Sequence, residues 1–266
     1  MIDITDDDCA SRYAVLQDFF SSKVSLQDAT DKLASASLSN DSLSLTWNLI
    51  ITYACKFPEH HDKLVDVLVH LSKLPDATTD KDEPLKKYNM QIWRDLPMLG
   101  WDFREEWNVQ PISSALLDDQ QKAILSFFNL NKFTALLMAT GEPVFNYSWF
   151  ALIAFRNAFE IPPNQLPRTD PLDAYVQAAA AWIETIGIEV YEWDEEYEHG
   201  PLVGAPGSGG PLWKGKHGFC KERWQLWREI FGELASLDAK LGEEAKTAAR
   251  ETEMIMRDIE NGDVEE

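Results

Sequence analysis

Apolar residues recur three and four positions apart along most of the chain, whereas segments that alternate between apolar and polar residues are scarce. The first spacing is that of one face of a helix. It predicts four helices in an N-terminal section, residues 1–75. They cover residues 5–22, a short segment opened by Ser25, a segment from Asp41 or Ser42 to Pro58, and residues 59–74. Ser25 and Asp28 have the spacing of a capping box, which supports the start of the second helix.

Residues 76–88 show no apolar period and are predicted to form a linker or an exposed loop. The section that follows, residues 89–245, is rich in aromatic residues, because nine of the ten tryptophans lie between Trp93 and Trp227. A charged helical end and an acidic tail are expected over residues 246–266.

Within the aromatic section the helical pattern is interrupted at several proline and glycine positions, which we expect to separate the elements. Only Ile188–Trp193 has the character of a strand. The predicted helices are 89–107 with breaks at Pro97 and Gly100, one from Asp118, one from Asn131 to about Gly141, 146–159, one from Asp170 to about Ile186, and 219–258 with a possible interruption at Gly232 or Gly242.

These patterns predict an all-α fold of about nine to eleven helices, arranged as a multi-helix bundle or as stacked helical hairpins. The alanine run at 178–181 would let neighbouring helices approach closely, so the helix that carries it is expected to be central.

The net charge of the chain disfavours two classes of binding partner. The formal net charge is −21, which disfavours nucleic acid and anionic membrane surfaces as partners. No run of 18 apolar residues predicts a membrane-spanning helix, and the acidic first residues do not resemble a signal peptide. Three widely spaced cysteines without a CxxC motif indicate reduced thiols, so we expect an intracellular protein, cytoplasmic or nuclear.

Several blocks of sequence together resemble one family. They are LPMLGWDFREEWN (96–108), LNKFTALL (130–137), WFALIAFRNAFE (149–160), PLDAYVQAAAAWIE (171–184) and GGPLWKGKHGFCKERWQLWREIF (209–231). The combination is similar to an uncharacterised family of filamentous-fungal proteins, domain of unknown function 3632. The resemblance implies an intracellular, mostly helical protein and carries no activity, cofactor or catalytic residue.

The glycine-rich loop 200–218 contains the most specific-looking motif. Residues 210–216 satisfy GxxxxGK, but a phosphate-binding loop requires exposed backbone amides and a hydroxyl residue after the lysine. Here Pro211 removes an amide, Trp213 fills space in the loop, and His217 stands in the hydroxyl position. Nucleotide binding through this motif is therefore not expected.

The same stretch concentrates basic side chains just before a predicted helix. A helix N-terminus flanked by such residues can hold a phosphate or carboxylate. The alternative is that the acidic run 192–198 neutralises the basic residues internally. The basic residues are Lys214, Lys216, His217, Lys221 and Arg223.

A second candidate region surrounds the predicted break in helix 89–107. Trp101, Arg104 and Glu105 lie beside it, and Arg156 lies among apolar residues in a later helix. An arginine paired with Glu105 or Glu160 could line a pocket, or it could be an ion pair that joins two helices. No metal-ligand spacing is present, and a Cys220–His217 pair would lack a third group to orient it.

We therefore expect a non-enzymatic protein-binding or scaffold module, with Trp213, Trp224, Trp227 and Arg228 as interface anchors if they are exposed. The alternative is a small-molecule binder or cofactor-independent enzyme with its pocket between the 97–107 helix break and the 200–219 loop. No cofactor is expected. The candidate binding residues are Trp101, Arg104, Glu105, Arg156, Trp213, Lys214, Lys216, His217, Arg223 and Trp227.

Overall fold

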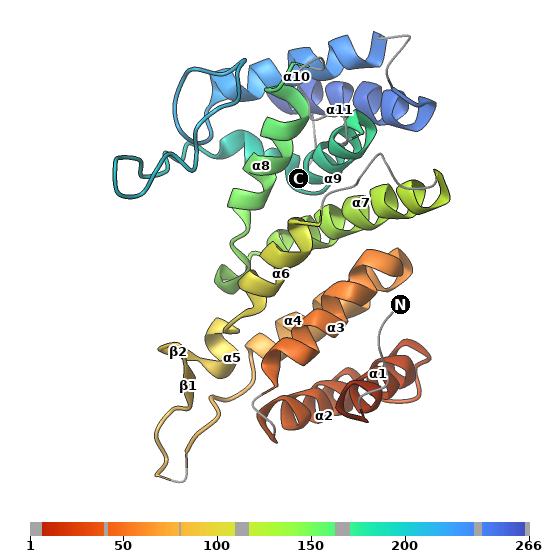
Figure 1. Cartoon of the computed structure of the whole chain (residues 1–266), viewed down its shortest axis with the longest axis vertical. Helices are drawn as coiled ribbons and strands as arrows, with labels where there is room; N and C mark the ends of the chain where they lie inside the picture. Colours follow the sequence, from red (N-terminus) through yellow and green to blue (C-terminus); the bar gives the residue numbers. More distant parts are fainter. Residues whose placement is uncertain are drawn as a thin grey trace. The chain divides into compact units, whose positions relative to one another are not determined.

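The computed structural model describes residues 7–39, 42–79, 81–109, 117–162, 171–236 and 241–263. Over these residues the protein is helical, with a single two-stranded sheet (Figure 1), which confirms the predicted all-α fold. The helices form two compact units. Unit 1 comprises Met1–Val109 and Thr140–Asn146, and unit 2 comprises Gln110–Ala139 and Tyr147–Glu266.

Unit 1 contains the four helices predicted for the N-terminal section, and the segment 76–88 lies within this unit. The core of unit 1 contains Leu33, Trp47, Ile50 and Leu64, all fully buried. Its elements are α1 (Asp7–Phe20), α2 (Leu26–Ser39), α3 (Leu43–Lys56), η1 (Pro58–His60), α4 (His61–Ser72), β1 (Lys86–Lys87), β2 (Met90–Gln91), α5 (Ile92–Asp95), α6 (Leu99–Trp107) and η2 (Pro143–Phe145).

Local hydrogen bonds explain where α2 begins. The backbone amide of Asp28 donates to the Ser25 hydroxyl at 3.1 Å, and that hydroxyl donates to the Asp28 carboxylate at 2.7 Å. The Ser25 hydroxyl thereby holds the pKa of Asp28 below its usual range. The predicted cap at Ser25 is confirmed. Ser42 precedes α3 without capping it, because its hydroxyl instead accepts from the buried Arg12 guanidinium; Asp41 lies outside the described residues.

The predicted break in helix 89–107 is confirmed at Pro97. Leu96 and Met98 have φ of 42° and 73°, so the chain turns through left-handed conformations between α5 and α6. The buried Trp47 indole donates to the Pro97 carbonyl at 2.9 Å, which fastens α3 to this turn. The break expected at Gly100 is wrong, because Gly100 lies inside α6.

Unit 2 is built around α9. This helix packs against α7, α8 and α11, while α10 packs against α11 and α8 (Figure 1). Ala178–Ala181 are buried along α9, as expected for a central helix whose small side chains admit close neighbours. The elements of unit 2 are α7 (Leu117–Ala139), α8 (Ser148–Phe159), α9 (Leu172–Glu192), α10 (Lys221–Ser236) and α11 (Glu243–Asn261).

Two local predictions in unit 2 are wrong. Asn131 does not cap a new helix: it lies inside α7, where its amide donates to the Phe127 carbonyl and accepts from the buried Trp182 indole at 2.9 Å. The hydrogen bond from Trp182 on α9 explains why a polar residue occupies the interior of α7. The local pattern assigns Asn131 to a helix start. Ile188–Glu192 are helical, as a continuation of α9 past a kink at Ile186 with φ −138° and ψ 35°, so the expected strand is absent there.

The long pattern over 219–258 forms two helices, α10 and α11. Gly242 is the residue before α11, whereas Gly232 lies inside α10. Among the described residues, no helix combines the length and the apolar character needed to cross a membrane.

Candidate functional site

Unit 1 exposes a pair of large aromatic side chains. Tyr88 lies in the turn between β1 and β2, where it and Asn89 adopt φ of 52° and 65°, and Trp101 lies in the first turns of α6. Their ring centroids are 5.1 Å apart, the ring planes are tilted by 56°, and the residues are 61% and 55% exposed. We call this pair the wedge. Large exposed aromatics at close range are the side chains that most often anchor protein interfaces.

Carboxylates lie beside the wedge on the same helix. Glu105 is exposed and follows Trp101 by four positions, so the two share a face of α6. Asp102 is half-buried, and one of its oxygens, Oδ2, is buried without a hydrogen-bond partner among the described residues. Burial raises the pKa of the Asp102 carboxyl, with a smaller upward contribution from Glu105, and a hydrogen bond with Ser44 partly opposes this shift. Arg104 is exposed, and within the described part of the chain it forms no ion pair.

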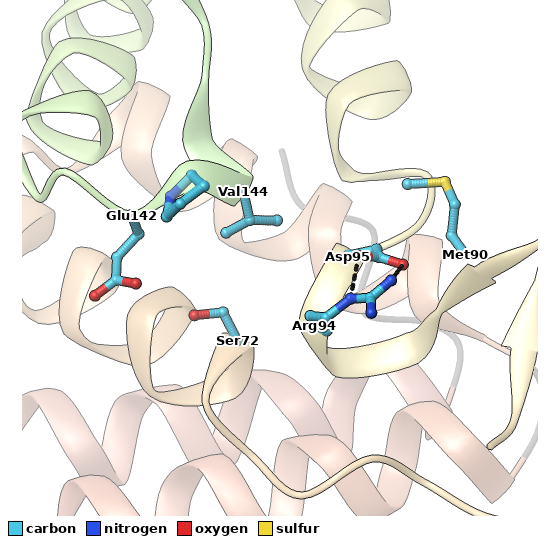
Figure 2. Close-up of a pocket in the computed structure, with 7 residues that line it drawn as sticks. Ser72, Met90, Arg94, Asp95, Glu142 and Val144 are labelled. Carbon is cyan, nitrogen blue, oxygen red and sulfur yellow. Dashed lines mark hydrogen bonds and ion pairs between the residues drawn. The ribbon is translucent and has the colours of Figure 1, made fainter.

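Unit 1 also has a cavity of about 580 Å³, a volume in the range of small-molecule sites. Figure 2 shows Arg94 and Asp95 side by side at one edge of it, with Glu142 and Val144 at another. Its lining residues are Ser72, Met90, Arg94, Asp95, Glu142, Pro143 and Val144.

The charged groups of this cavity are already paired. Arg94 Nε and Nη2 donate to the two carboxylate oxygens of Asp95 at 2.8 and 3.0 Å, and this hydrogen bonding lowers the pKa of Asp95. Glu142 lies 2.5 Å from Lys73 Nζ. The cavity therefore offers an apolar wall from Met90 and Val144 together with a charge-balanced rim.

In unit 2, residues 193–220 form a long loop between α9 and α10, which we call the arm (Figure 1). Its two sides are joined where the Tyr197 amide donates to the His217 carbonyl at 2.7 Å and the Phe219 amide donates to the Glu195 carbonyl at 2.9 Å. Leu202 lies toward its tip and is 99% exposed. The arm thus has a hydrogen-bonded stem and an apolar tip.

A buried ion pair fixes the base of the arm. Arg223 Nε and Nη2 donate to the Glu160 carboxylate at 2.7 and 3.0 Å, and both side chains are fully buried. Glu160 also accepts from the Gly210 amide at 2.7 Å and from the Trp227 indole at 2.8 Å. Arg223 Nη1 donates to the carbonyls of Gly207 and Gly218 at 3.1 and 2.7 Å. Because a buried ion pair is stable only when its remaining donors and acceptors are satisfied, these loop contacts are part of its stabilisation.

The close approach of the arm to this pair explains several of its glycines. A Cβ atom at Gly210 would lie 2.5 Å from the Glu160 carbonyl oxygen. At Gly207 and Gly218 it would overlap the backbones of His217 and Glu195. The glycine-rich composition that resembles a phosphate-binding loop therefore serves packing around Glu160 and Arg223.

Acidic partners within the arm and α9 already satisfy two of the basic side chains. Lys216 Nζ donates to the Asp194 carboxylate at 2.6 Å, and this hydrogen bond raises the pKa of Lys216. Lys221 Nζ donates to Glu192 at 2.9 Å and lies over the Tyr191 ring. These contacts correspond to the alternative in which the acidic run neutralises the basic cluster. Lys214 remains exposed.

Four other aromatic and histidine candidates of unit 2 have packing partners. Trp213 is half-buried, and its indole donates to the Lys216 carbonyl at 2.9 Å. Trp224 and Trp227 are only 2% and 1% exposed, so neither presents a free surface in this structure. His217 lies against His199 with ring centroids 4.2 Å apart, and its Nδ1 is buried without a hydrogen-bond partner within the described chain.

The residues considered for an arginine–carboxylate pocket are divided between the two units. Arg104 and Glu105 belong to unit 1 and Arg156 belongs to unit 2, while Glu160 pairs with Arg223. Burial lowers the pKa of Arg156, with Glu160 opposing that effect. The two segments expected to border a pocket, 97–107 and 200–219, likewise belong to different units, so that pocket stays a prediction.

Catalytic and metal-binding arrangements have little support among the described residues. Burial raises the pKa of the Cys220 thiol, which is the opposite of what an activated nucleophile requires. No group of three or more histidine, cysteine, aspartate or glutamate side chains within the described ranges is placed to hold a metal ion.

Sequence reasoning missed Tyr88 and underestimated Glu160. Lys87-Tyr88-Asn89 did contain a signal, since asparagine readily adopts the left-handed conformation that a tight hairpin turn requires. Glu160 follows the last residue of α8, and its partner Arg223 lies 63 positions away, so no local pattern indicates the pair.

Comparison with known proteins places the chain in a family. No curated protein and no solved structure matches it significantly. A family described as "Protein of unknown function (DUF3632)" matches residues 47–231, which is well over half of the chain. The match includes Trp101, Glu160, Arg223 and Trp227 and ends within α10. This protein therefore belongs to the DUF3632 family of proteins of unknown function.

Proposed function

We propose that this protein is a non-enzymatic protein-binding or scaffold module that acts in the cytoplasm or nucleus of a filamentous fungus. One observation carries the proposal: the wedge leaves a tyrosine and a tryptophan more than half exposed and in contact with each other. Aromatic side chains that are buried on association contribute most of the binding energy of many interfaces. The arm of unit 2 is a weaker candidate, because its Trp213 is half-buried and its Lys216 is paired with Asp194.

The proposal is tested by affinity capture from a filamentous-fungal lysate, with the intact protein as bait and quantitative comparison of variants. If the wedge anchors a partner, Tyr88→Ala combined with Trp101→Ala should weaken capture by roughly thirtyfold, which corresponds to about 2 kcal/mol for a hot spot. Leu202→Ala is the control, since it removes an apolar side chain that is even more exposed and belongs to the other unit.

The proposal depends on whether capture is lost from the wedge variant alone. A captured protein that is lost from the wedge variant and retained by Leu202→Ala supports the proposal. Equal capture by all three baits, or capture lost only with Leu202→Ala, would overturn the assignment to the wedge.

The cavity lined by Met90 and Arg94 supports a second candidate function, a small-molecule binder or cofactor-independent enzyme. A thermal-shift screen against metabolites tests it, because a ligand at a hundred times its Kd stabilises the folded state by about 2.7 kcal/mol. A saturable shift that Val144→Trp abolishes, while Leu202→Trp does not, would support the cavity as the site. A flat response across the library would count against this second function.

A further inference from the structure

We propose that the wedge of Tyr88 and Trp101 receives a cationic side chain, arginine or lysine in free or methylated form, from a basic segment of a protein partner. The inference rests on the proposed protein-binding function and specifies the chemistry of the partner. It is carried by the geometry of the two rings together with the carboxylates that accompany Trp101 on α6.

The first step is the geometry of the rings. Centroids 5.1 Å apart and planes tilted by 56° mean that the two rings pack directly against each other, and both residues are more than half exposed, so ring surface remains open to a partner. The face of an aromatic ring carries negative charge density, so it attracts a cation within about 6 Å of the centroid, and indole does so most strongly. A cation can therefore lie over the exposed ring surface of this pair, on the side that faces solvent.

The second step is the charge around the rings. Glu105 is exposed one helical turn beyond Trp101, so a cation over the indole could also approach this carboxylate. Asp102 follows Trp101 directly, but its Oδ2 is buried, so Glu105 is the carboxylate that a partner can reach. The whole chain carries a formal charge of −21, which favours approach of a basic segment over long range.

The third step is where the cations of the described residues lie. Within the described ranges, the lysines and arginines that lie over aromatic rings contact Phe19, Tyr191, Trp213 and Trp227. Arg104, three positions after Trp101, is exposed to solvent.

Two neighbouring lysines oppose the proposal and have to be weighed. Lys86 and Lys87 precede Tyr88, but both line a separate cavity of about 280 Å³ with Leu38 and Ile92. The charge of Lys86 acts on Asp95, whose pKa it helps to lower. Helix α6, which carries Trp101, has three carboxylates and one arginine, Arg104, so its formal charge is negative.

Other occupants fit less well. A second copy of this chain carries the same −21 charge and would be repelled. A proline-rich segment also binds between exposed aromatics, but it makes no use of the adjacent carboxylates. Binding of a proline-rich segment is therefore the alternative that the test has to distinguish.

The test uses 19F NMR of the full-length protein labelled with 5-fluorotryptophan, in which the Trp101 signal is assigned by its loss in Trp101→Phe. The probes are choline, which carries a quaternary ammonium, and its neutral isostere 3,3-dimethylbutan-1-ol. We expect choline to shift the Trp101 signal saturably and to bind two- to fivefold more tightly than the isostere, the ratio typical of an exposed cation–π contact. The signals of the buried Trp224 and Trp227 should not respond.

Matched variants on the same helix identify the source of the preference. Glu105→Gln should reduce the ratio between choline and the isostere, whereas Arg104→Gln should raise it, because the two substitutions change the charge near Trp101 in opposite directions. Tyr88→Leu should reduce the preference, because one of the two rings is lost, while leaving the fold intact, as the unchanged signals of the other tryptophans would verify.

Each outcome has a distinct meaning. Equal binding of the two probes, no response at Trp101, or a response only to an octaproline peptide would overturn the cation proposal. If capture from lysate still depends on the wedge in that case, the protein-binding function stands and only its partner chemistry changes. If both experiments are negative, both proposals fall.

Discussion

The region around the wedge in unit 1 and the base of the arm in unit 2 contain the same kinds of side chain. They differ in whether those side chains have hydrogen-bond and ion-pair partners within the protein. At the base of the arm, Arg223, Glu160 and Trp227 bond to one another and to glycine backbones, and all three are buried. At the wedge, Trp101 lies exposed on α6. Arg104 and Glu105 of the same helix are also exposed and form no ion pair with described residues. The comparison teaches that residue type alone does not separate a structural cluster from a binding surface. A structural cluster is distinguished from a binding surface by whether its side chains have partners within the protein.

The largest effect is expected when the charge of the buried pair is removed. Glu160→Gln keeps the shape of the side chain but leaves the buried Arg223 guanidinium without its counter-charge, so we expect a loss of about 3–5 kcal/mol from the free energy of unfolding. Chemical denaturation measures it. Arg257→Gln, which breaks an exposed pair with Glu253 on α11, is the control and should cost about 0.3–0.5 kcal/mol. Equal effects would contradict the structural role of Glu160.

The same substitution at two tryptophans compares the regions directly. Trp227→Ala should destabilise the protein by about 3–5 kcal/mol, because it opens a cavity beside Phe155 and removes a donor from Glu160. Trp101→Ala should change stability by no more than about 0.5 kcal/mol, as is usual at an exposed site. Thermal denaturation of both variants checks this, and a large loss with Trp101→Ala would mean that the wedge is a packing element.

Glycine substitutions give a smaller contrast. Gly210→Ala would place a methyl group 2.5 Å from the Glu160 carbonyl oxygen, so we expect a loss of about 1–3 kcal/mol. Gly100→Ala in α6 meets no atom within 4 Å and should stabilise the protein by about 0.5–1 kcal/mol, because alanine is the better helix former. The two variants are compared by urea unfolding. A gain in stability at Gly210 would contradict the close packing of the arm.

The smallest effect concerns the carboxyl beside the wedge. Burial raises the pKa of Asp102 in the folded state, so its neutral form is favoured there. Its contribution to stability is therefore fully present below the ordinary aspartate pKa of about 4 and is lost as the pH rises through the folded-state pKa. We expect Asp102→Asn to be more stable than the original protein at pH 7 and to lose this advantage near pH 3.5. Urea unfolding at several pH values measures the difference, and a difference independent of pH would contradict it.

Much of the fold could be predicted from the sequence because helix periodicity and caps are local. The inward face of α3 with Trp47 and the cap at Ser25 depend on neighbours within a few positions. The role of Asn131 could not be predicted, because its indole partner is 51 positions away.

The candidate site was harder to predict for the same reason. The sequence analysis included Trp101, Arg104 and Glu105 among the candidates, but their exposure and the approach of Tyr88 depend on a hairpin turn with two left-handed residues. It also drew attention to the basic cluster, whose pairing with the acidic run was an open alternative. The exposure of Trp101 and the pairing of the basic cluster both depend on which side chains find partners after folding. The periodicity of apolar residues does not determine this.

The separation between Glu160 and Arg223 also has a consequence for synthesis of the chain. Gly210 follows Glu160 by 50 positions, Arg223 by 63 and Trp227 by 67, so a nascent chain that has completed α8 still lacks every one of these partners. Until α10 has left the ribosome, the carboxylate of Glu160 must stay in water, and the end of α8 cannot bury it. Closure of such long segments is entropically costly and slow relative to helix formation. Folding of the arm is thus a late event that follows synthesis of α10, and chains truncated before residue 223 would carry an unpaired charge at Glu160, where the longer chain has the buried pair with Arg223.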